Sequence, residues 1–254
     1  MTVDGATPRR RQDAMSGPPA GVPCDVPGDL HPVCRASPSD APEIADVLAD
    51  AFHGYPWTDW VVRGERRHQR LSALHRISLE LVAFPYGSVW GARCPAGRGL
   101  VGAIAVLRPD RPVPPDVRAR VEAQQADLLG CRADAAAAAH RLLDDVRPAE
   151  AGLLVATVGV AHGHRRRGVA HRLLGCALGL ADELGVPAHL ETSSPGNVSL
   201  YRSAGFTVTA QRRVAADGPD VWVMRRPPRT PQTTRSGESG GLSPGARGRA
   251  RPVR

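Results

Sequence analysis

The feature that most constrains the fold is a buried strand, a basic loop and an amphipathic helix that follow one another directly. The strand is the apolar run Leu153–Val160, "LLVATVGV", which is rich in β-branched residues. A continuous apolar run of this length is typical of a central strand covered on both faces. The polar loop 162–167 follows, and a helix then carries apolar residues on one face, namely Leu173, Leu174, Ala177, Leu178 and Ala181. This order predicts an α/β fold.

The remaining segments extend this core into a mixed central sheet flanked by helices. A second strand, 186–192, should run parallel to the first, because a crossover helix joins them. Strands 87–93 and 99–107 are separated by turn residues and predict an antiparallel hairpin. Further strands are expected at 33–36, 206–214 and 221–225, and helices at 40–51, 65–84, 116–129, 132–146 and 197–204. Asp40 and Glu43 have the spacing of a capping box at the first helix.

Two proline- or glycine-rich ends flank this core. Residues 1–32 contain six prolines and few large apolar residues, so they cannot bury enough surface to offset the entropy of ordering them. Residues 229–254 are rich in Arg, Gly and Pro and lead to the same expectation. The sequence therefore predicts a disordered arm at 1–32, one domain at 33–228, and a disordered tail at 229–254.

The positive charge of the chain does not by itself indicate a nucleic-acid partner. The net charge is +8, and all 33 basic residues are Arg, which is the usage expected from a GC-rich bacterial gene. Six of these Arg residues, against Glu238 alone, fall in 229–254. The balance left in the core is too small to argue for a DNA-binding fold, so at most weak binding through the tail is expected.

Cysteine and histidine spacing argues against a disulfide framework or a metal site. The five cysteines are scattered and form no C-x-x-C pair. His162 and His164 share a loop but have no third ligand close in sequence, so a solvated loop is the simpler interpretation. No apolar run predicts a membrane-spanning helix or a signal peptide, so the expected location is the cytoplasm.

The junction between the central strand and its helix has the chemistry of a phosphate site. Arg165, Arg166, Arg167, Gly168, Val169 and Ala170 stand where the helix begins. Free N–H groups and the positive end of the helix dipole can hold a phosphate there. The pattern R-x-x-G-x-A is short, and a basic helix start is more often solvated surface. Its position after a buried strand favours the functional interpretation.

Four blocks of sequence, in this order and spacing, resemble the GNAT superfamily of acetyl-CoA-dependent N-acetyltransferases. They are "VATVGV", "HRRRGVA", "HLETSSPGNVSLYRSAGFTVTA" and "WVMRR". Within the superfamily the blocks "LETS", "N-x-x-x-Y" and "GFTVTA", with "AFHGYPWTDWVV" earlier, are most similar to the puromycin N-acetyltransferase branch. The resemblance covers residues 33–228 and is looser in the N-terminal half.

The resemblance implies how acetyl-CoA would be held. The strand would part from its neighbour near residue 157, which leaves backbone groups of Val158, Gly159 and Val160 free to pair with the pantetheine chain. One of these N–H groups would polarise the thioester carbonyl. The pyrophosphate would lie on 165–170. Family members usually have Gly at the position of Arg166 and often at that of Ala170. If Arg166 must adopt φ > 0, strain of about 1 kcal/mol follows.

The resemblance also implies two catalytic residues. Glu191, in "LETS", would accept a proton from the acceptor amine, either directly or through water. The alternative for Glu191 is a strand-end carboxylate in water or in a salt bridge. Tyr201, in "N-x-x-x-Y", would donate a proton to the departing sulfur, and a core ring with its hydroxyl at the surface is the alternative. Asn197 could cap its helix or bind the pantetheine.

These observations predict an acetyltransferase that acts on a primary amine of a small molecule. An aminonucleoside antibiotic such as puromycin is one candidate acceptor, and the aromatic residues Phe52, Tyr55, Trp57 and Trp60 form either core or one wall of the acceptor site. Direct transfer in a ternary complex is expected, because Cys176 faces the sheet and buried thiols are inert. The alternatives are an idle acyl-CoA-binding domain and a nucleic-acid or acidic-partner binder that uses the Arg-rich loop and tail. The chain could act as a monomer or a homodimer.

Overall fold

The computed structural model describes residues 31–95, 97 and 99–229. The predicted arm at 1–32, apart from its last two residues, and the predicted tail, apart from Arg229, lie outside the described residues.

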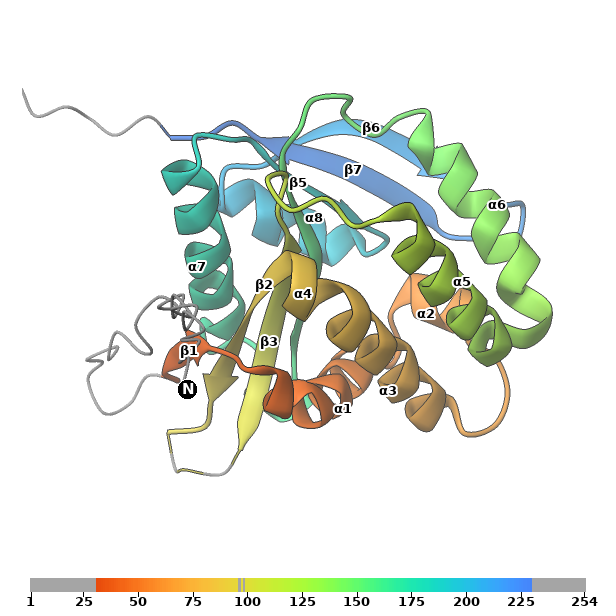
Figure 1. Ribbon diagram of the computed structural model, residues 1–254, viewed down its shortest axis with the longest axis horizontal. Coiled ribbons are helices and arrows are strands. Elements are labelled where there is room, and N and C mark those ends of the chain that lie inside the picture. Colours follow the sequence, from red (N-terminus) through yellow and green to blue (C-terminus); the bar gives the residue numbers. More distant parts are fainter. Residues whose placement is uncertain (1–30, 96, 98, 230–254) are drawn as a thin grey trace, which may run out of the picture.

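A mixed sheet of seven strands forms the centre of the described chain (Figure 1). The strand order is β1-β2-β3-β4-β5-β7-β6. Only the pair β4–β5 is parallel, as predicted, and the other pairs are antiparallel. The strands are β1 (Val33–Arg35), β2 (Gly87–Arg93), β3 (Leu100–Leu107), β4 (Leu153–Val160), β5 (Ala188–Thr192), β6 (Thr207–Arg213) and β7 (Asp220–Arg226).

Helices cover both faces of this sheet and form an additional layer at one end (Figure 1). The α-helices are α1 (Ala41–Ala51), α2 (Pro56–Val61), α3 (Arg67–Ser78), α4 (Phe84–Tyr86), α5 (Pro115–Leu129), α6 (Ala133–Asp144), α7 (Val169–Glu183) and α8 (Pro195–Ser203). The shorter helical turns are η1 (Pro38–Asp40), η2 (Leu79–Ala83), η3 (Gly130–Arg132) and η4 (His162–His164).

Two glycines show how closely α1 and α7 pack on opposite faces of the sheet. A Cβ at Gly159 of β4 would lie 2.8 Å from atoms of Leu48 and Ala51 in α1. A Cβ at Gly102 of β3 would lie 3.2 Å from Val169 in α7. A side chain at Gly159 would therefore force α1 or its side chains to move, whereas at Gly102 a small shift of a neighbouring atom would suffice.

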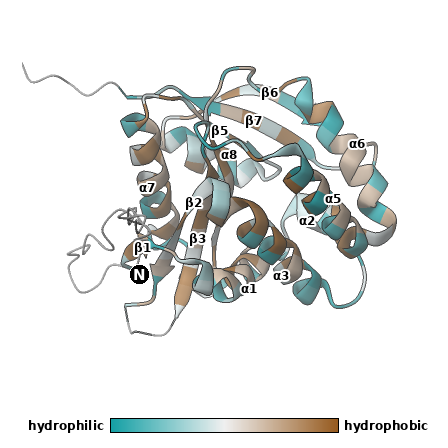
Figure 2. Ribbon diagram, in the orientation of Figure 1, coloured by the Kyte–Doolittle hydropathy of each residue, from teal (hydrophilic) through white to brown (hydrophobic). Residues whose placement is uncertain are grey.

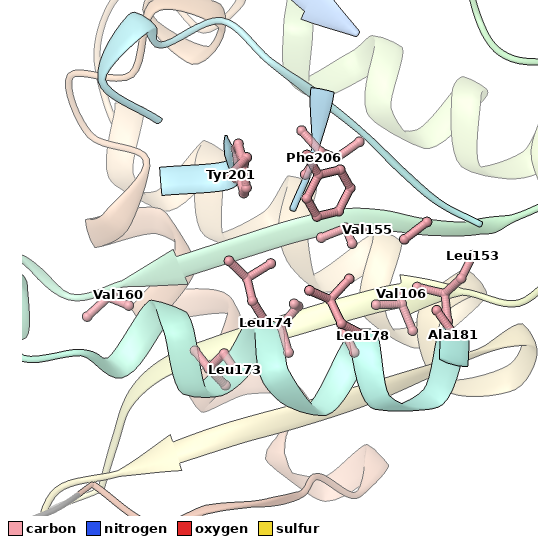
Figure 3. Packing of buried hydrophobic residues seen from close by; sticks show 14 of the residues in the cluster. Val106, Leu153, Val155, Val160, Leu173, Leu174, Leu178, Ala181, Tyr201 and Phe206 are labelled. Atoms are coloured by element: carbon pink, nitrogen blue, oxygen red, sulfur yellow. The ribbon is translucent and has the colours of Figure 1, made fainter. Parts of the chain in front are cut away.

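The main core lies between the sheet and α7 (Figure 3). Leu173, Leu174 and Ala181 of α7 are buried against strand residues that include Val106 and Leu153. A second cluster joins α1 and η2 to β2 and β3, and a third lies among α2, α3, α6 and β7. The hydrophobic residues accordingly concentrate in the central strands (Figure 2).

Three local expectations were wrong. Strand β4 is not continuously buried, since Leu154 is 37% exposed, because α1 covers that face only near Gly159. The capping box joins Ser37 and Asp40, while Glu43 instead accepts a hydrogen bond from the Leu100 backbone N–H (2.7 Å). The helix expected at 65–84 is broken by the π-helical turn η2 shortly before Pro85, whose missing N–H prevents a regular helix from continuing.

Candidate active site

A wedge opens in the sheet where β4 and β5 part. The two strands pair only at Leu153 with Ala188 and at Leu154 with His189. Beyond this point β4 stays paired with β3, and the Ala161 N–H donates to the Val101 carbonyl (2.9 Å). Because backbone groups alternate along an antiparallel strand, the Gly159 N–H also faces β3.

The backbone N–H and carbonyl groups of Val158 and Val160 therefore face the wedge. The Val160 carbonyl accepts a hydrogen bond from Arg165 Nε (3.3 Å) on that side. Of the three backbone positions predicted to pair with a cofactor, Val158 and Val160 face away from β3, with the Val160 carbonyl bonded to Arg165, whereas Gly159 faces β3 and packs closely against α1.

A cavity of about 560 Å³, which we call the wedge cavity, occupies this opening. Its lining contains most of the residues predicted to bind a cofactor, namely Val158, Gly159, Val160, Arg165, Arg166, Gly168, Val169, Ala170 and Asn197. Arg167 is absent from that lining. The strand edge, the basic loop and the start of α7 thus meet at one place, as the sequence predicted.

The loop at the start of α7 is held in an unusual backbone conformation. Arg166 has φ of 60° and Gly168 has φ of 76°. A left-handed conformation costs an L-residue such as Arg166 roughly 1–2 kcal/mol. The condition stated from the sequence, that Arg166 adopts φ > 0, is therefore met.

The C-terminal end of α1 anchors this loop. Arg165 Nη2 donates to the Ala51 carbonyl (2.7 Å), so this guanidinium is used by the protein itself. The Asp50 carboxylate accepts a hydrogen bond from the His162 backbone N–H (2.8 Å), and its pKa is lowered by that bond despite partial burial. His164 Nδ1 lies 3.0 Å from His31 Nε2. Within the described residues no group of three or more His, Cys, Asp or Glu could hold a metal ion.

A second cavity, of about 490 Å³, lies on the other side of the wedge. We call it the inner cavity. Glu191 of β5 lines it, together with residues of α3, η2, α5 and α6. The two cavities share five lining residues, which are Phe52, Tyr55, Val158, Asn197 and Tyr201. The two cavities therefore adjoin at these five residues.

Glu191 is held by a partner that the sequence did not indicate. Arg147 Nε lies 2.5 Å from Glu191 Oε1, and Arg147 Nη2 lies 3.1 Å from Oε2. The Glu191 side chain is 24% exposed. Arg147 also contacts Asp144, and these carboxylates raise its pKa although burial opposes them. The salt-bridge alternative for Glu191 is thus confirmed, while its role as a base stays a prediction for a carboxylate that borders the inner cavity.

Tyr201 stands where the two cavities meet. Its side chain is 5% exposed and packs edge-on against Phe206 with ring centroids 6.0 Å apart. The ring thus belongs to the core, as the alternative weighed from the sequence expected, and the role of its hydroxyl as a proton donor stays a prediction. Burial and, secondarily, the nearby Tyr55 raise the pKa of the Tyr201 phenol. At neutral pH the hydroxyl therefore stays protonated, and the raised pKa makes it a weaker acid than an exposed tyrosine.

Asn197 is the third residue of α8, and Ser194 occupies the N-cap position. The capping role considered for Asn197 is therefore excluded. Asn197 instead lines both cavities.

Tyr55 joins the N-terminal half of the domain to the end of β5. Its hydroxyl accepts a hydrogen bond from the Ser193 N–H (2.8 Å) and lies 3.0 Å from Thr192 Oγ1. Phe52, Tyr55 and Trp57 line the inner cavity, whereas Trp60 is 4% exposed and belongs to the core. The aromatic segment is thus divided between a cavity wall and the core, and its part in an acceptor site stays a prediction.

Two histidines that sequence reasoning did not single out also line the inner cavity. Burial lowers the pKa of His75 to about 4. Burial first, and then Arg147, lower the pKa of His140, whose ring lies 5.1 Å from that of Trp57. Both imidazoles are therefore neutral at pH 7. Helical spacing along α3 and α6 was the only sequence signal that these two side chains point inward. That spacing does not show whether an inward side chain meets a cavity or the packed core.

Fold and site together define a GNAT-like α/β domain. Residues 97–206 match the model of the acetyltransferase (GNAT) family. Over this stretch the chain is therefore similar to the acetyltransferase (GNAT) family. Across the described residues no helix combines the length and apolar character needed to cross a membrane.

Several solved structures share this fold at low sequence identity. The histone acetyltransferase HPA2 and related acetyltransferase from Corynebacterium glutamicum has 23% identity and a TM-score of 0.60, over 80% of this chain and 99% of that one. The C-terminal condensation domain of Ebony has 15% identity and a TM-score of 0.54, over 78% and 99%. A mosquito arylalkylamine N-acetyltransferase-like protein has 16% identity and a TM-score of 0.50, over 77% and 99%. At these identities the likeness concerns the fold alone.

Proposed function

We propose that the protein transfers the acetyl group of acetyl-CoA to a primary amine of a small molecule by direct attack within a ternary complex. The observation that carries this proposal is the pair of adjoining cavities, which share five lining residues. The wedge cavity has an unpaired strand edge and a basic helix start, while the inner cavity has a carboxylate, and Tyr201 lies between them. Because acetyl-CoA is an intracellular metabolite, the proposal implies a cytoplasmic enzyme.

The residues of the wedge cavity fit the chemistry of acetyl-CoA. The outward backbone groups of Val158 and the outward N–H of Val160 can pair with the amides of an extended pantetheine chain as an added strand would, while Arg165 is bonded to the Val160 carbonyl. The N–H groups of Gly168, Val169 and Ala170 begin a 15-residue helix and suit a pyrophosphate. The Arg166 guanidinium can bind a phosphate of the cofactor, and that interaction can offset the strain in the Arg166 backbone.

In the proposed reaction the amine nitrogen bonds to the thioester carbonyl carbon and the C–S bond breaks. Glu191, on the inner-cavity side, accepts a proton from the amine. Arg147 is a positioning residue, since its guanidinium fixes the carboxylate and competes with the incoming proton. Tyr201 donates a proton to the leaving sulfur. The Val158 N–H, at the junction, can stabilise the negative charge that develops on the carbonyl oxygen.

Cys176 gives no support to an acetyl-enzyme route. It lies on α7 and lines neither cavity among the described residues. Direct transfer is therefore the mechanism that the geometry supports best.

The amine acceptor is a separate part of the proposal. Puromycin is the first acceptor to test, because the sequence blocks described above resemble that branch, and acetylation of such a compound would confer antibiotic resistance. The idle acyl-CoA-binding alternative predicts acetyl-CoA binding without thiol release. The nucleic-acid alternative predicts a salt-sensitive mobility shift that requires residues after Pro228.

The decisive test is thiol release from acetyl-CoA with a panel of amines, measured across pH with mass detection of the product. Glu191→Gln should reduce turnover most at low pH, where the amine is protonated, and the defect should shrink as pH approaches the pKa of the amine. Arg147→Gln should change the pH profile while acetyl-CoA affinity stays constant. Exposed Arg213→Gln is the matched control. Thiol release by no amine would overturn the proposal.

A further inference from the structure

The inner cavity contains very little charge. Among the described residues that line it, Glu191 is the single carboxylate, and no Arg is present. His75 and His140 are neutral at pH 7 because burial lowers the pKa of each. The lining therefore offers one carboxylate, on the side where β5 ends, and Arg147, which lies outside the lining, forms a salt bridge with it.

The rest of the lining is predominantly apolar. Aromatic rings of Phe52 and Trp57 face it from one side, and aliphatic side chains of α3, η2, α5 and α6 complete it, including Leu74, Val82 and Leu129. A volume of about 490 Å³ is in the range of sites that enclose a drug-sized ligand. A second positive charge or a carboxylate on the ligand would lose its hydration here without gaining a partner.

Two enclosed polar atoms of the lining have no partner among the described residues. They are Nε2 of His75 and Oγ1 of Thr157. Enclosed polar groups in proteins are nearly always hydrogen-bonded, so such atoms at a cavity wall indicate where a ligand or water completes the bond. Both atoms are uncharged at neutral pH and therefore match a neutral group.

We infer that the acceptor is a monocationic primary amine whose bulky, mainly aromatic or aliphatic body carries a neutral hydrogen-bonding group such as a hydroxyl, ether or amide. This inference rests on the proposed function and specifies its substrate class. The ammonium group lies toward Glu191, and the body fills the space beneath α5 and α6. Polyamines, aminoglycoside-like polycations, Lys-rich peptides and free amino acids fall outside the class.

The charge requirement is tested with matched acceptors at fixed acetyl-CoA. Phenylalaninamide and phenylalanine differ by one carboxylate, and phenethylamine and spermidine represent an apolar monoamine and a polyamine. We expect kcat/KM for phenylalaninamide to exceed that for phenylalanine by at least about tenfold, because a carboxylate has no partner in the cavity. A preference for phenylalanine or spermidine would overturn the inference.

The hydrogen-bonding requirement is tested with two side chains. Phenethylamines with a hydroxyl or methoxy group at each ring position are compared with the unsubstituted amine. In Thr157→Val or in His75→Phe, the advantage in kcat/KM of the preferred substituted amine over the unsubstituted amine should fall about five- to tenfold. Thr157→Ser keeps the hydroxyl and should therefore keep any preference for a substituted amine that Thr157→Val reduces. The matched control is Thr207→Val, at an exposed position.

Different results would refute the acceptor class and the proposed function. Thiol release with polycationic or anionic acceptors alone would leave the proposed function standing and refute the acceptor class. An unchanged substituent preference in both variants, with melting temperatures equal to that of the parent, would refute the role of the unpaired atoms. Absence of thiol release with every amine would instead refute the proposed function.

Discussion

Acid should destabilise this protein through the His75 ring, which lies in the wall of the inner cavity. Burial lowers its pKa from 6.5 to about 4 in the folded protein. A group whose pKa is depressed by folding contributes stability that is present above its unfolded pKa. That contribution is lost as pH falls from 6.5 through about 4, because the unfolded chain takes up the proton more readily.

The magnitude follows from the same two pKa values. Proton linkage gives a loss of about 2 kcal/mol by pH 5 and about 3 kcal/mol by pH 4. This is a large share of the total stability of a typical domain, which is about 5–15 kcal/mol. Other groups also titrate in this range, so the effect must be isolated by comparison.

Urea unfolding of the parent, His75→Gln and His68→Gln at pH 7 and pH 5 provides that comparison. His68 is exposed on the same helix and serves as the control. The difference in unfolding free energy between the two pH values should be about 2 kcal/mol smaller in His75→Gln than in the parent, and unchanged in His68→Gln. Equal pH dependence in all three proteins would show that the His75 ring is solvated and would refute the reasoning.

Three further changes have defined outcomes. Arg166→Gly should raise the unfolding free energy in urea by about 1 kcal/mol, because glycine adopts positive φ without strain; no gain would show that the loop is unstrained. Gly159→Ala should cost about 1–3 kcal/mol, since its Cβ would lie 2.8 Å from Leu48, whereas Gly175→Ala, whose Cβ would meet nothing within 4 Å, should be neutral or stabilising. Tyr201→Phe should lower kcat by roughly 10² to 10⁴ at unchanged acetyl-CoA affinity, and full activity would exclude it as the proton donor.

Much of the fold was predictable because its signals are local in the chain. The strand, basic loop and helix at 153–183 follow from side-chain periodicity, and the parallel pairing of β4 with β5 follows from the crossover between them. The left-handed conformation of Arg166 was raised from the sequence as a condition, because the resembling family usually has glycine there, and the structure meets that condition.

The parts that could not be predicted depend on contacts between distant segments. Arg147 lies 44 residues before Glu191, in a loop without periodicity, so nothing in the sequence pairs them. Tyr55 meets Ser193 across 138 residues. The length and direction of a side chain decide such contacts, and they become visible only when the sheet brings both segments to one edge.

Contacts between distant segments also decide which aromatic residues of the segment from Phe52 to Trp60 line the cavity and which lie in the core. Trp57 and Trp60 belong to the six-residue helix α2, which was not predicted, and their rings lie 5.5 Å apart with only Trp60 in the core. Apolar residue type alone cannot distinguish a core position from a cavity wall.

The central claim is that the wedge between β4 and β5 holds acetyl-CoA, and calorimetric titration of the full chain with acetyl-CoA tests it most directly, without an acceptor. The account predicts saturable binding of one acetyl-CoA per chain that free coenzyme A displaces. Binding should also raise the melting temperature, because the ligand stabilises only the folded state. No heat of binding and no change in melting temperature at millimolar acetyl-CoA would contradict the account.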